Sequence, residues 1–150
     1  MKIAVSADHG AFDLKESVKK HLEEKGIEYH DFGCFSKESV DYPRYAYYAA
    51  SAVARKEYDF GIILCTTGLG VSMAANKVKG IRAAVCTNEM LARMTRSHNN
   101  ANVICMGQNV VSKELANKLI DIFLSTEFEG GRHQRRIDLL TDIENGKELD

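Results

Sequence analysis

The sequence predicts an α/β fold in which helices cover both faces of an open parallel sheet. Short apolar segments alternate about five times with longer segments of helical periodicity, and this alternation is typical of parallel sheets. The segment Phe60–Cys65 is apolar without interruption, as in strands that are covered on both faces. The 150 residues, 45% of them apolar, suffice for one domain with a sizeable core, and we expect a single domain over residues 1–150.

Five segments are candidates for strands. They are residues 2–6, 27–33, 60–65, 80–86 and 101–107.

The segments between these strands predict helices. Leu14, Val18 and Leu22 follow helical spacing, and Gly26 is a suitable stop. Pro43 lies near the start of the second helical segment, where proline is tolerated. The predicted helices are 12–26, 41–57, 69–78, 88–98 and 112–126, and an extra basic helix follows residue 131.

Composition excludes several classes of protein. With 20 basic and 21 acidic residues, the net charge of −1 gives no overall attraction to nucleic acid or to an anionic membrane. Asp8 interrupts the first apolar run, which is too short for a signal peptide, and no run is long enough to span a membrane. The four cysteines lie far apart, without the spacing of a disulfide framework or a zinc site. We therefore expect a soluble, cytoplasmic protein with free thiols.

The most informative motif follows the predicted strand that ends at Cys65. Ligands of open α/β sheets bind beyond the carboxyl ends of the strands. Gly68 and Gly70 allow the backbone to approach a ligand and to turn into a helix, whose first N–H groups favour an anion and the thiolate form of Cys65. The loop lacks the Lys-Ser/Thr of a Walker loop and the third glycine of a dinucleotide fingerprint. A structural cysteine at a tight turn is the alternative interpretation.

Two further motifs combine an imidazole with a small polar side chain. Asp8 and His9 follow the first strand and suit the binding of sugar hydroxyls or acid–base work, unless Asp8 only caps the next helix. His98 can exchange a proton near neutral pH, and Asn99 follows it. The alternative is a helix C-cap at Asn99 or Asn100, with His98 interacting with the helix dipole.

Arg132 and Arg136 are four residues apart and share one helix face, so that together they can clamp a phosphate, unless this is only a solvated basic surface. Tyr42 offers a hydroxyl to a ligand or packs in the interior. Taken together, a thiol base, an oxyanion-binding loop, a histidine acid and a phosphate clamp fit proton transfer next to a carbonyl on a phosphorylated substrate. That reaction needs no cofactor.

The motifs match, in order and over nearly the whole chain, those of one family. They are KIAVSADHGAF, DYPRYA, CTTGLGVSMAANKVKGIRAA, RSHNNANV and EGGRHQRR. The chain thus resembles the ribose-5-phosphate isomerase B family, which includes the galactose-6-phosphate isomerase subunits. The resemblance implies a Rossmann-like three-layer α/β/α sandwich with a five-stranded parallel sheet. It also implies homodimers, often paired into homotetramers, with the active site at the subunit interface.

The resemblance implies metal-independent interconversion of ribose 5-phosphate and ribulose 5-phosphate through an enediol, without a cofactor. Cys65 is then the base, Thr67 its hydrogen-bonding neighbour, and His98 the acid that opens the furanose ring. The backbone groups expected to stabilise the enediolate oxygen belong to Thr66, Gly68, Leu69 and Gly70. The expected ligands of the sugar and its phosphate are Asp8, His9, Tyr42, Asn99, Arg132 and Arg136.

Two residues depart from the family pattern. Thr66 stands where glycine is usual, and Asn109 stands where many members have an arginine. These departures bear on phosphate binding and on the length of the sugar. An isomerase of allose or galactose 6-phosphate is therefore an alternative. A noncatalytic module that binds a phosphosugar or nucleotide is another, because fold alone does not fix function; Cys65 and His98 argue against it.

Overall fold

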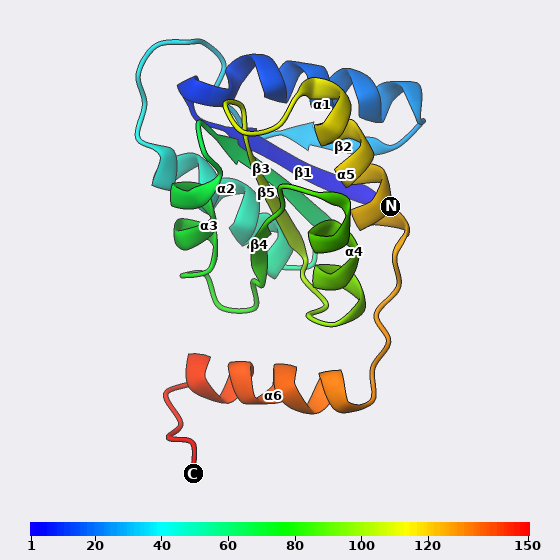
Figure 1. The fold of residues 1–150 in the computed structure, drawn as a ribbon. Coiled ribbons are helices and arrows are strands. Elements are labelled where there is room, and N and C mark those ends of the chain that lie inside the picture. The colour runs from blue at the N-terminus through cyan, green and yellow to red at the C-terminus, as the bar shows by residue number, and fades with distance from the viewer.

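The computed structural model describes all 150 residues and contains one sheet of five parallel strands (Figure 1). The strands lie in the order β2-β1-β3-β5-β4, and all four neighbouring pairs are parallel. Their bounds are Lys2–Ala7 for β1, Glu28–Asp31 for β2, Phe60–Cys65 for β3, Ala83–Val85 for β4 and Val103–Gly107 for β5. The strands of a parallel sheet all end at the same edge, so the carboxyl ends of β1, β3 and β5 are neighbours.

Helices cover both faces of the sheet, which confirms the predicted fold. Five helices belong to this sandwich: α1 (Phe12–Glu24), α2 (Tyr42–Ala54), α3 (Leu69–Ala75), α4 (Glu89–Ser97) and α5 (Lys113–Ser125). Helices α1, α4 and α5 cover one face, and α2 and α3 cover the other. A short 3-10 turn, His9–Ala11, links β1 to α1.

The side chains of the apolar strand β3 pack alternately into the hydrophobic clusters on the two faces of the sheet. Ile62 and Leu64 belong to the cluster beneath α1, α4 and α5, whereas Ile63 and Cys65 belong to the cluster beneath α2 and α3. Because successive side chains of a strand point to opposite faces, a strand covered on both faces has to be apolar throughout. None of the helices combines the length and the apolar character needed to cross a lipid bilayer.

The fourth predicted strand is shorter than expected. The prediction covered residues 80–86, but β4 comprises only Ala83–Val85. Gly80 has a φ of +89°, which belongs to a turn, and the side chain of Arg82 binds backbone carbonyls of a neighbouring loop. The prediction was wrong at this end because apolar character alone does not reveal these polar contacts.

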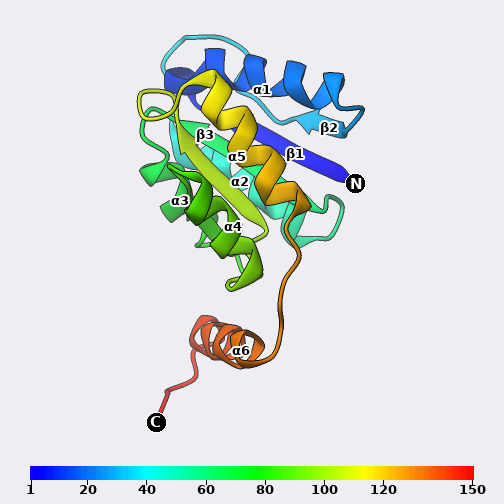
Figure 2. The same cartoon turned by 45° about the vertical axis from the view of Figure 1, so that its right-hand side comes forward.

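The last helix, α6 (Arg132–Glu144), stands apart from the sandwich in both views (Figures 1 and 2). Only His133 and Ile137 of this helix are buried. Leu139, Leu140 and Ile143 are between 44% and 56% exposed. Helix α6 therefore presents an apolar surface that the chain itself does not cover.

A buried ion pair joins α1 to β2. The side chain of Lys15 is only 1% exposed, and its Nζ lies 2.5 Å from Asp31 Oδ2, which Lys19 also contacts at 2.9 Å. Burial alone would raise the pKa of Asp31, but hydrogen bonds from Lys15 and Lys19 reverse this effect and hold the pKa below its ordinary value. Asp31 is therefore charged at neutral pH and stabilises the buried ammonium.

We expect Asp31→Asn to destabilise the protein by about 3–5 kcal/mol at pH 7, because it leaves the buried Lys15 charge poorly compensated. A lowered native pKa contributes stability above the unfolded-state pKa of about 3.9, and that contribution is lost as the pH falls through the native pKa. In urea unfolding, the difference between wild type and variant should thus be full above about pH 5 and shrink below about pH 4.

Asp13→Asn is the control, because it removes an ion pair with Lys37 in which both side chains are exposed. We expect it to change stability little at any pH. A destabilisation by Asp31→Asn that stays constant down to pH 2 would contradict the assignment.

Candidate active site

Strand β3 ends at Cys65, where the chain turns sharply into α3. Cys65 is 6% exposed, and the backbone N–H of Gly68 donates a hydrogen bond to its Sγ over 3.1 Å. Gly68 has a φ of +82°, and a Cβ at this position would lie 2.9 Å from the carbonyl carbon of Met106. Only glycine fits this turn, and the turn directs an N–H at the sulfur, where it stabilises negative charge.

The rest of the loop leaves backbone donors free. The N–H of Leu69 donates to Thr67 Oγ1 over 3.2 Å, so the Thr67 side chain organises the loop itself. The N–H groups of Thr66, Thr67 and Gly70 donate no hydrogen bond within the chain. Such unpaired amides can bind a substrate oxygen on which negative charge develops.

Three other segments approach this loop closely, and each close approach is possible because a glycine at that point has no side chain. A Cβ on Gly10 would lie 2.1 Å from Thr66 Oγ1, and one on Gly70 would lie 2.7 Å from the ring of Tyr42. Gly107 likewise lies against the backbone of Thr67. The loops after β1 and β5 and the start of α2 are thereby assembled around Cys65.

The motif after β1 contributes a carboxylate and an imidazole to this edge. Asp8 is 7% exposed, and its Oδ1 caps the 3-10 turn by accepting from the N–H of Gly10 over 2.9 Å. The capping role proposed as an alternative is therefore confirmed for one oxygen, and Oδ2 accepts no hydrogen bond within the chain. His9 Nδ1 accepts from the N–H of Val40 over 3.1 Å, which leaves Nε2–H as a donor.

The structure thus brings together at the carboxyl edge most of the residues singled out from the sequence. They are Asp8, His9, Tyr42, Cys65, Thr66, Thr67, Gly68, Leu69 and Gly70. Asn109 is at the same edge, where its N–H donates to the carbonyl of Thr66 over 3.0 Å.

The other three cysteines have no comparable environment. Burial raises the pKa of Cys34 and Cys105, and it raises the pKa of Cys86 to about 12. These thiols remain protonated at neutral pH. Cys34 Sγ donates to the carbonyl of Ser36 over 3.3 Å, whereas the sulfur of Cys65 accepts the N–H of Gly68.

His98, Asn99, Arg132 and Arg136 are at the opposite edge of the sheet. His98 caps the carboxyl end of α4, which leads back to the start of β5. There the carbonyl of Asn102 accepts from the N–H of Gly61, four residues before Cys65. Four residues of parallel strand span about 13 Å. Within a single chain these four residues are therefore far from the Cys65 loop, and the site at a subunit interface that the resemblance implies stays a prediction.

Two arginines that sequence analysis did not single out hold the turn after α4. Arg82 donates to the carbonyls of Asn99 and Asn100 over 2.9–3.1 Å. The buried Arg96 donates to the side chain of Asn100 and to the carbonyl of Ala101, and its guanidinium packs on the ring of Phe60. The C-cap of α4 is His98, so the alternative of a C-cap at Asn99 or Asn100 is wrong; Asn100, with a φ of +46°, makes the left-handed turn that follows. In the sequence, the only sign of these contacts is Arg82, a charged residue within the otherwise apolar segment 80–86.

The turn borders a cavity of about 250 Å³ beneath α6. Its lining residues are His98, Asn99, His133, Arg136, Ile137 and Leu140. His98 and His133 stack with ring centroids 4.1 Å apart, and Glu129 lies beside both rings. These three side chains form the one group in the chain with the donor atoms and proximity to hold a metal ion. Burial, with the charges of His98 and Arg132, lowers the pKa of His133.

The chain is similar in sequence to known sugar isomerases over almost its full length. A family model described as Ribose/Galactose Isomerase matches residues 3–140. The chain belongs to this family. Ribose-5-phosphate isomerase B of Escherichia coli is 48% identical over 143 residues, which are 95% of this chain and 96% of that protein.

Solved structures of the family have the same fold. Ribose-5-phosphate isomerase B of Clostridium thermocellum superposes with a TM-score of 0.96 at 49% identity, covering 97% of this chain and 99% of that one. The enzyme of Mycoplasma genitalium, solved with bound ribulose 5-phosphate, gives a TM-score of 0.92 at 41% identity over 96% of each chain. The resemblance and the fold inferred from the sequence motifs are thereby confirmed.

We expect Gly68→Ala to destabilise the protein more than Gly80→Ala. Both glycines have a left-handed φ, of +82° and +89°, but a Cβ on Gly80 meets only Ala54 at 4.0 Å, whereas one on Gly68 meets the backbone of β5. The left-handed φ costs about 1 kcal/mol in each variant, and the clash should add about 1–3 kcal/mol at Gly68 alone. Urea unfolding measures both, and equal losses would show that the contact with β5 does not constrain the loop.

Proposed function

We propose that this protein interconverts ribose 5-phosphate and ribulose 5-phosphate. The observation that carries the proposal is the Cys65 thiol, which receives the N–H of Gly68 beside three unpaired loop amides. Proton transfer between two adjacent carbons needs one base and a group that stabilises the oxyanion, and both are at this edge. The relatives named ribose-5-phosphate isomerase B, one solved with bound ribulose 5-phosphate, support the choice of substrate.

In the proposed reaction the Cys65 thiolate takes the proton from C2 of the open-chain aldose. The electron pair of that bond forms the C1–C2 double bond, and the carbonyl oxygen on C1 becomes an enediolate oxygen beside the amides of Thr67 and Gly70. A proton then passes from the hydroxyl on C2 to the oxygen on C1, so that the negative charge moves to the C2 oxygen. The thiol returns its proton to C1 as the C2 oxygen becomes the ketone. The thiolate is regenerated, so no cofactor is consumed.

We further propose that His98, Asn99, Arg132 and Arg136 act in the site of a second copy of the chain, within a homodimer. Two observations support this arrangement. These residues lie at the edge of the sheet opposite to Cys65 in their own chain. The apolar surface of α6 and the exposed Met73 of α3 and Met90 of α4, which are 65% and 56% exposed, offer a surface for the second copy to cover. In a two-fold dimer both sites would be completed in the same way.

In this arrangement His98 protonates the furanose ring oxygen to open the sugar, and Arg132 and Arg136 bind the phosphate. Their spacing places both guanidiniums on one face at the start of α6. We place the enzyme in the cytoplasm, an expectation supported by its four free cysteines. The family also includes galactose isomerases, so ribose, allose and galactose phosphates should be compared in one coupled assay.

The first prediction from this proposal concerns Cys65. Wild type should isomerise ribose 5-phosphate in the presence of EDTA, and Cys65→Ala should lower kcat by at least about 10²–10⁴-fold, because a general base contributes about that much. Cys86→Ala removes a buried thiol in the core on the other face of the sheet and is the matched control, with kcat near that of wild type. Loss of wild-type activity in EDTA, or turnover in Cys65→Ala close to that of the control, would refute the proposed chemistry.

The second prediction concerns the shared site. Cys65→Ala and the double variant Arg132→Ala/Arg136→Ala should each be nearly inactive at low substrate concentration. After subunit exchange, half of the dimers are mixed, and each mixed dimer has one intact site. Activity should therefore recover to about a quarter of that of wild type.

Subunit exchange is verified with a mass-tagged chain, and mixing Cys65→Ala with itself is the control. No recovery after full exchange would place Cys65 and the two arginines of each site on one chain.

A further inference from the structure

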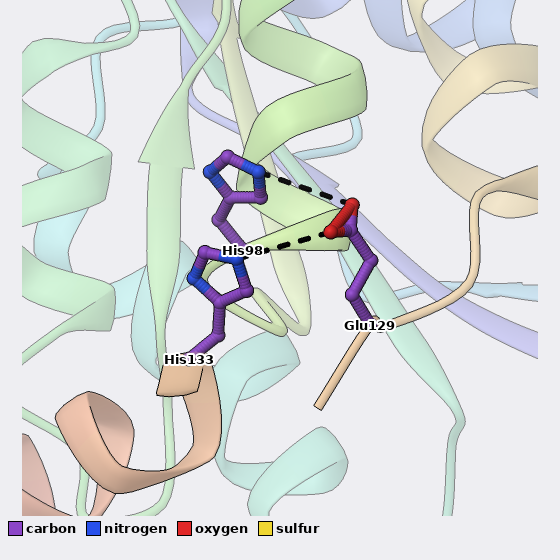
Figure 3. A group of neighbouring side chains, drawn as sticks. All are labelled: His98, Glu129 and His133. Atoms are coloured by element: carbon purple, nitrogen blue, oxygen red, sulfur yellow. Dashed lines mark ion pairs between the residues drawn. The ribbon is translucent and has the colours of Figure 1, made fainter. Parts of the chain in front are cut away.

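Three potential metal ligands converge where α4 ends and α6 begins. His98 and His133 lie side by side, and the carboxylate of Glu129 faces both rings (Figure 3). Glu129 Oε2 lies 3.9 Å from His98 Nε2, and Oε1 lies 3.8 Å from His133 Nε2. The three ligating atoms are within 4.8 Å of one another.

Among the three side chains, His133 gives the strongest indication of a bound ion. It is 7% exposed, and its Nε2 is buried without a hydrogen-bond partner. A buried polar atom that makes no hydrogen bond within the protein costs free energy, and a bound water or ion beside it removes that cost. This nitrogen is turned toward Glu129, the side on which His98 Nε2 also points (Figure 3).

The backbone holds the three residues near one another. The N–H of Glu129 donates to the carbonyl of Ser97 over 3.0 Å, which ties this segment to the residue before His98. Two glycines with left-handed φ, Gly130 and Gly131, then turn the chain into α6, so that His133 faces back toward Glu129. Residues 31 positions apart, Glu129 and His98, are thereby neighbours.

Two imidazoles and one carboxylate form a ligand set typical of zinc. In a tetrahedral site with bonds of about 2.0–2.1 Å, the ligand atoms are about 3.3 Å apart. The present separations therefore require shifts of about an ångström. The side chains of His98 and Glu129 are 33% and 57% exposed and have room for this movement, whereas His133 is fixed.

We propose that His98, Glu129 and His133 form a binding site for a divalent transition metal ion of the zinc type, and that the bound ion inhibits the isomerase. A metal ion on His98 Nε2 occupies the lone pair that would otherwise accept and deliver a proton. The inhibition rests on the proposed function of His98, but the binding does not. Because the proposed ion inhibits the enzyme, this site is compatible with an isomerase reaction that needs no metal.

Binding is tested by calorimetric titration with ZnSO₄ in a phosphate-free buffer. The protein is the full-length Cys65→Ala variant, which removes the thiol that would otherwise compete for zinc. We expect one zinc ion per chain, with binding weakened more than about tenfold by an added His133→Asn or Glu129→Gln, since even the loss of an outer-shell partner costs 10–100-fold. His21→Asn is the matched control, because His21 is also paired with a carboxylate, Asp121, at 2.7 Å but has no second histidine beside it.

Inhibition is tested on chains that keep Cys65. The zinc concentration for half-inhibition should rise at least tenfold in His133→Asn relative to its own metal-free rate, and it should not change in His21→Asn. No zinc binding by Cys65→Ala, or binding that survives both cluster variants, would overturn the site. Binding that the variants abolish, without inhibition of the wild type, would uphold the site and overturn both the inhibition and the proposed role of His98.

Discussion

At the carboxyl edge of the sheet, segments of backbone lie closer together than side chains would permit. Gly107 of β5 lies against Thr67, and Gly68 lies against Met106, so the loop after β3 and the end of β5 are in direct contact. The N–H groups of Gln108 and Asn109 complete this contact by donating to the carbonyls of Cys65 and Thr66 over 3.0 Å. The carbonyls of the loop accept hydrogen bonds from the residues that follow β5, whereas the N–H groups of Thr66, Thr67 and Gly70 stay free. The position of the thiol, the unpaired amides and the approach of Tyr42 all follow from that constraint.

The direction of the helices explains why one chain holds only half of the proposed site. Each helix of a parallel α/β fold returns the chain to the amino edge, so a residue that ends a helix and a residue that ends a strand are on opposite edges. Cys65 ends a strand, and His98 ends a helix. Arg82 and Arg96 hold the turn after α4 in place by donating hydrogen bonds to three of its successive residues. Two half-sites on opposite edges are the arrangement that the proposed symmetric homodimer requires.

The sequence predicted the fold and the Cys65 edge well, because both depend on local patterns. Uninterrupted apolar strands, helical spacing and glycines after a strand are properties of a few consecutive residues. The placement of His98 and the grouping with Glu129 and His133 could not be predicted in the same way, because they depend on where two distant segments meet. The hydrogen bond between Glu129 and Ser97 that joins these segments uses backbone atoms only, and backbone atoms leave no trace in the sequence. The short strand β4 illustrates the same limit, since it begins only after Arg82, whose side chain is bound to the turn after α4.

The side chain of Thr66 is accommodated by a glycine of a neighbouring loop. A side chain at this position could have filled the space in front of the loop amides. Instead its hydroxyl lies over Gly10, at a point where a Cβ on Gly10 would be 2.1 Å away, with Asp8 Oδ1 also close to that point. The absence of a side chain at Gly10 therefore makes room for the one that Thr66 adds, and the hydroxyl fills space between the loops after β1 and β3. The amides of Thr67 and Gly70 remain unpaired, so the extra side chain is compatible with an oxyanion site formed by the same loop.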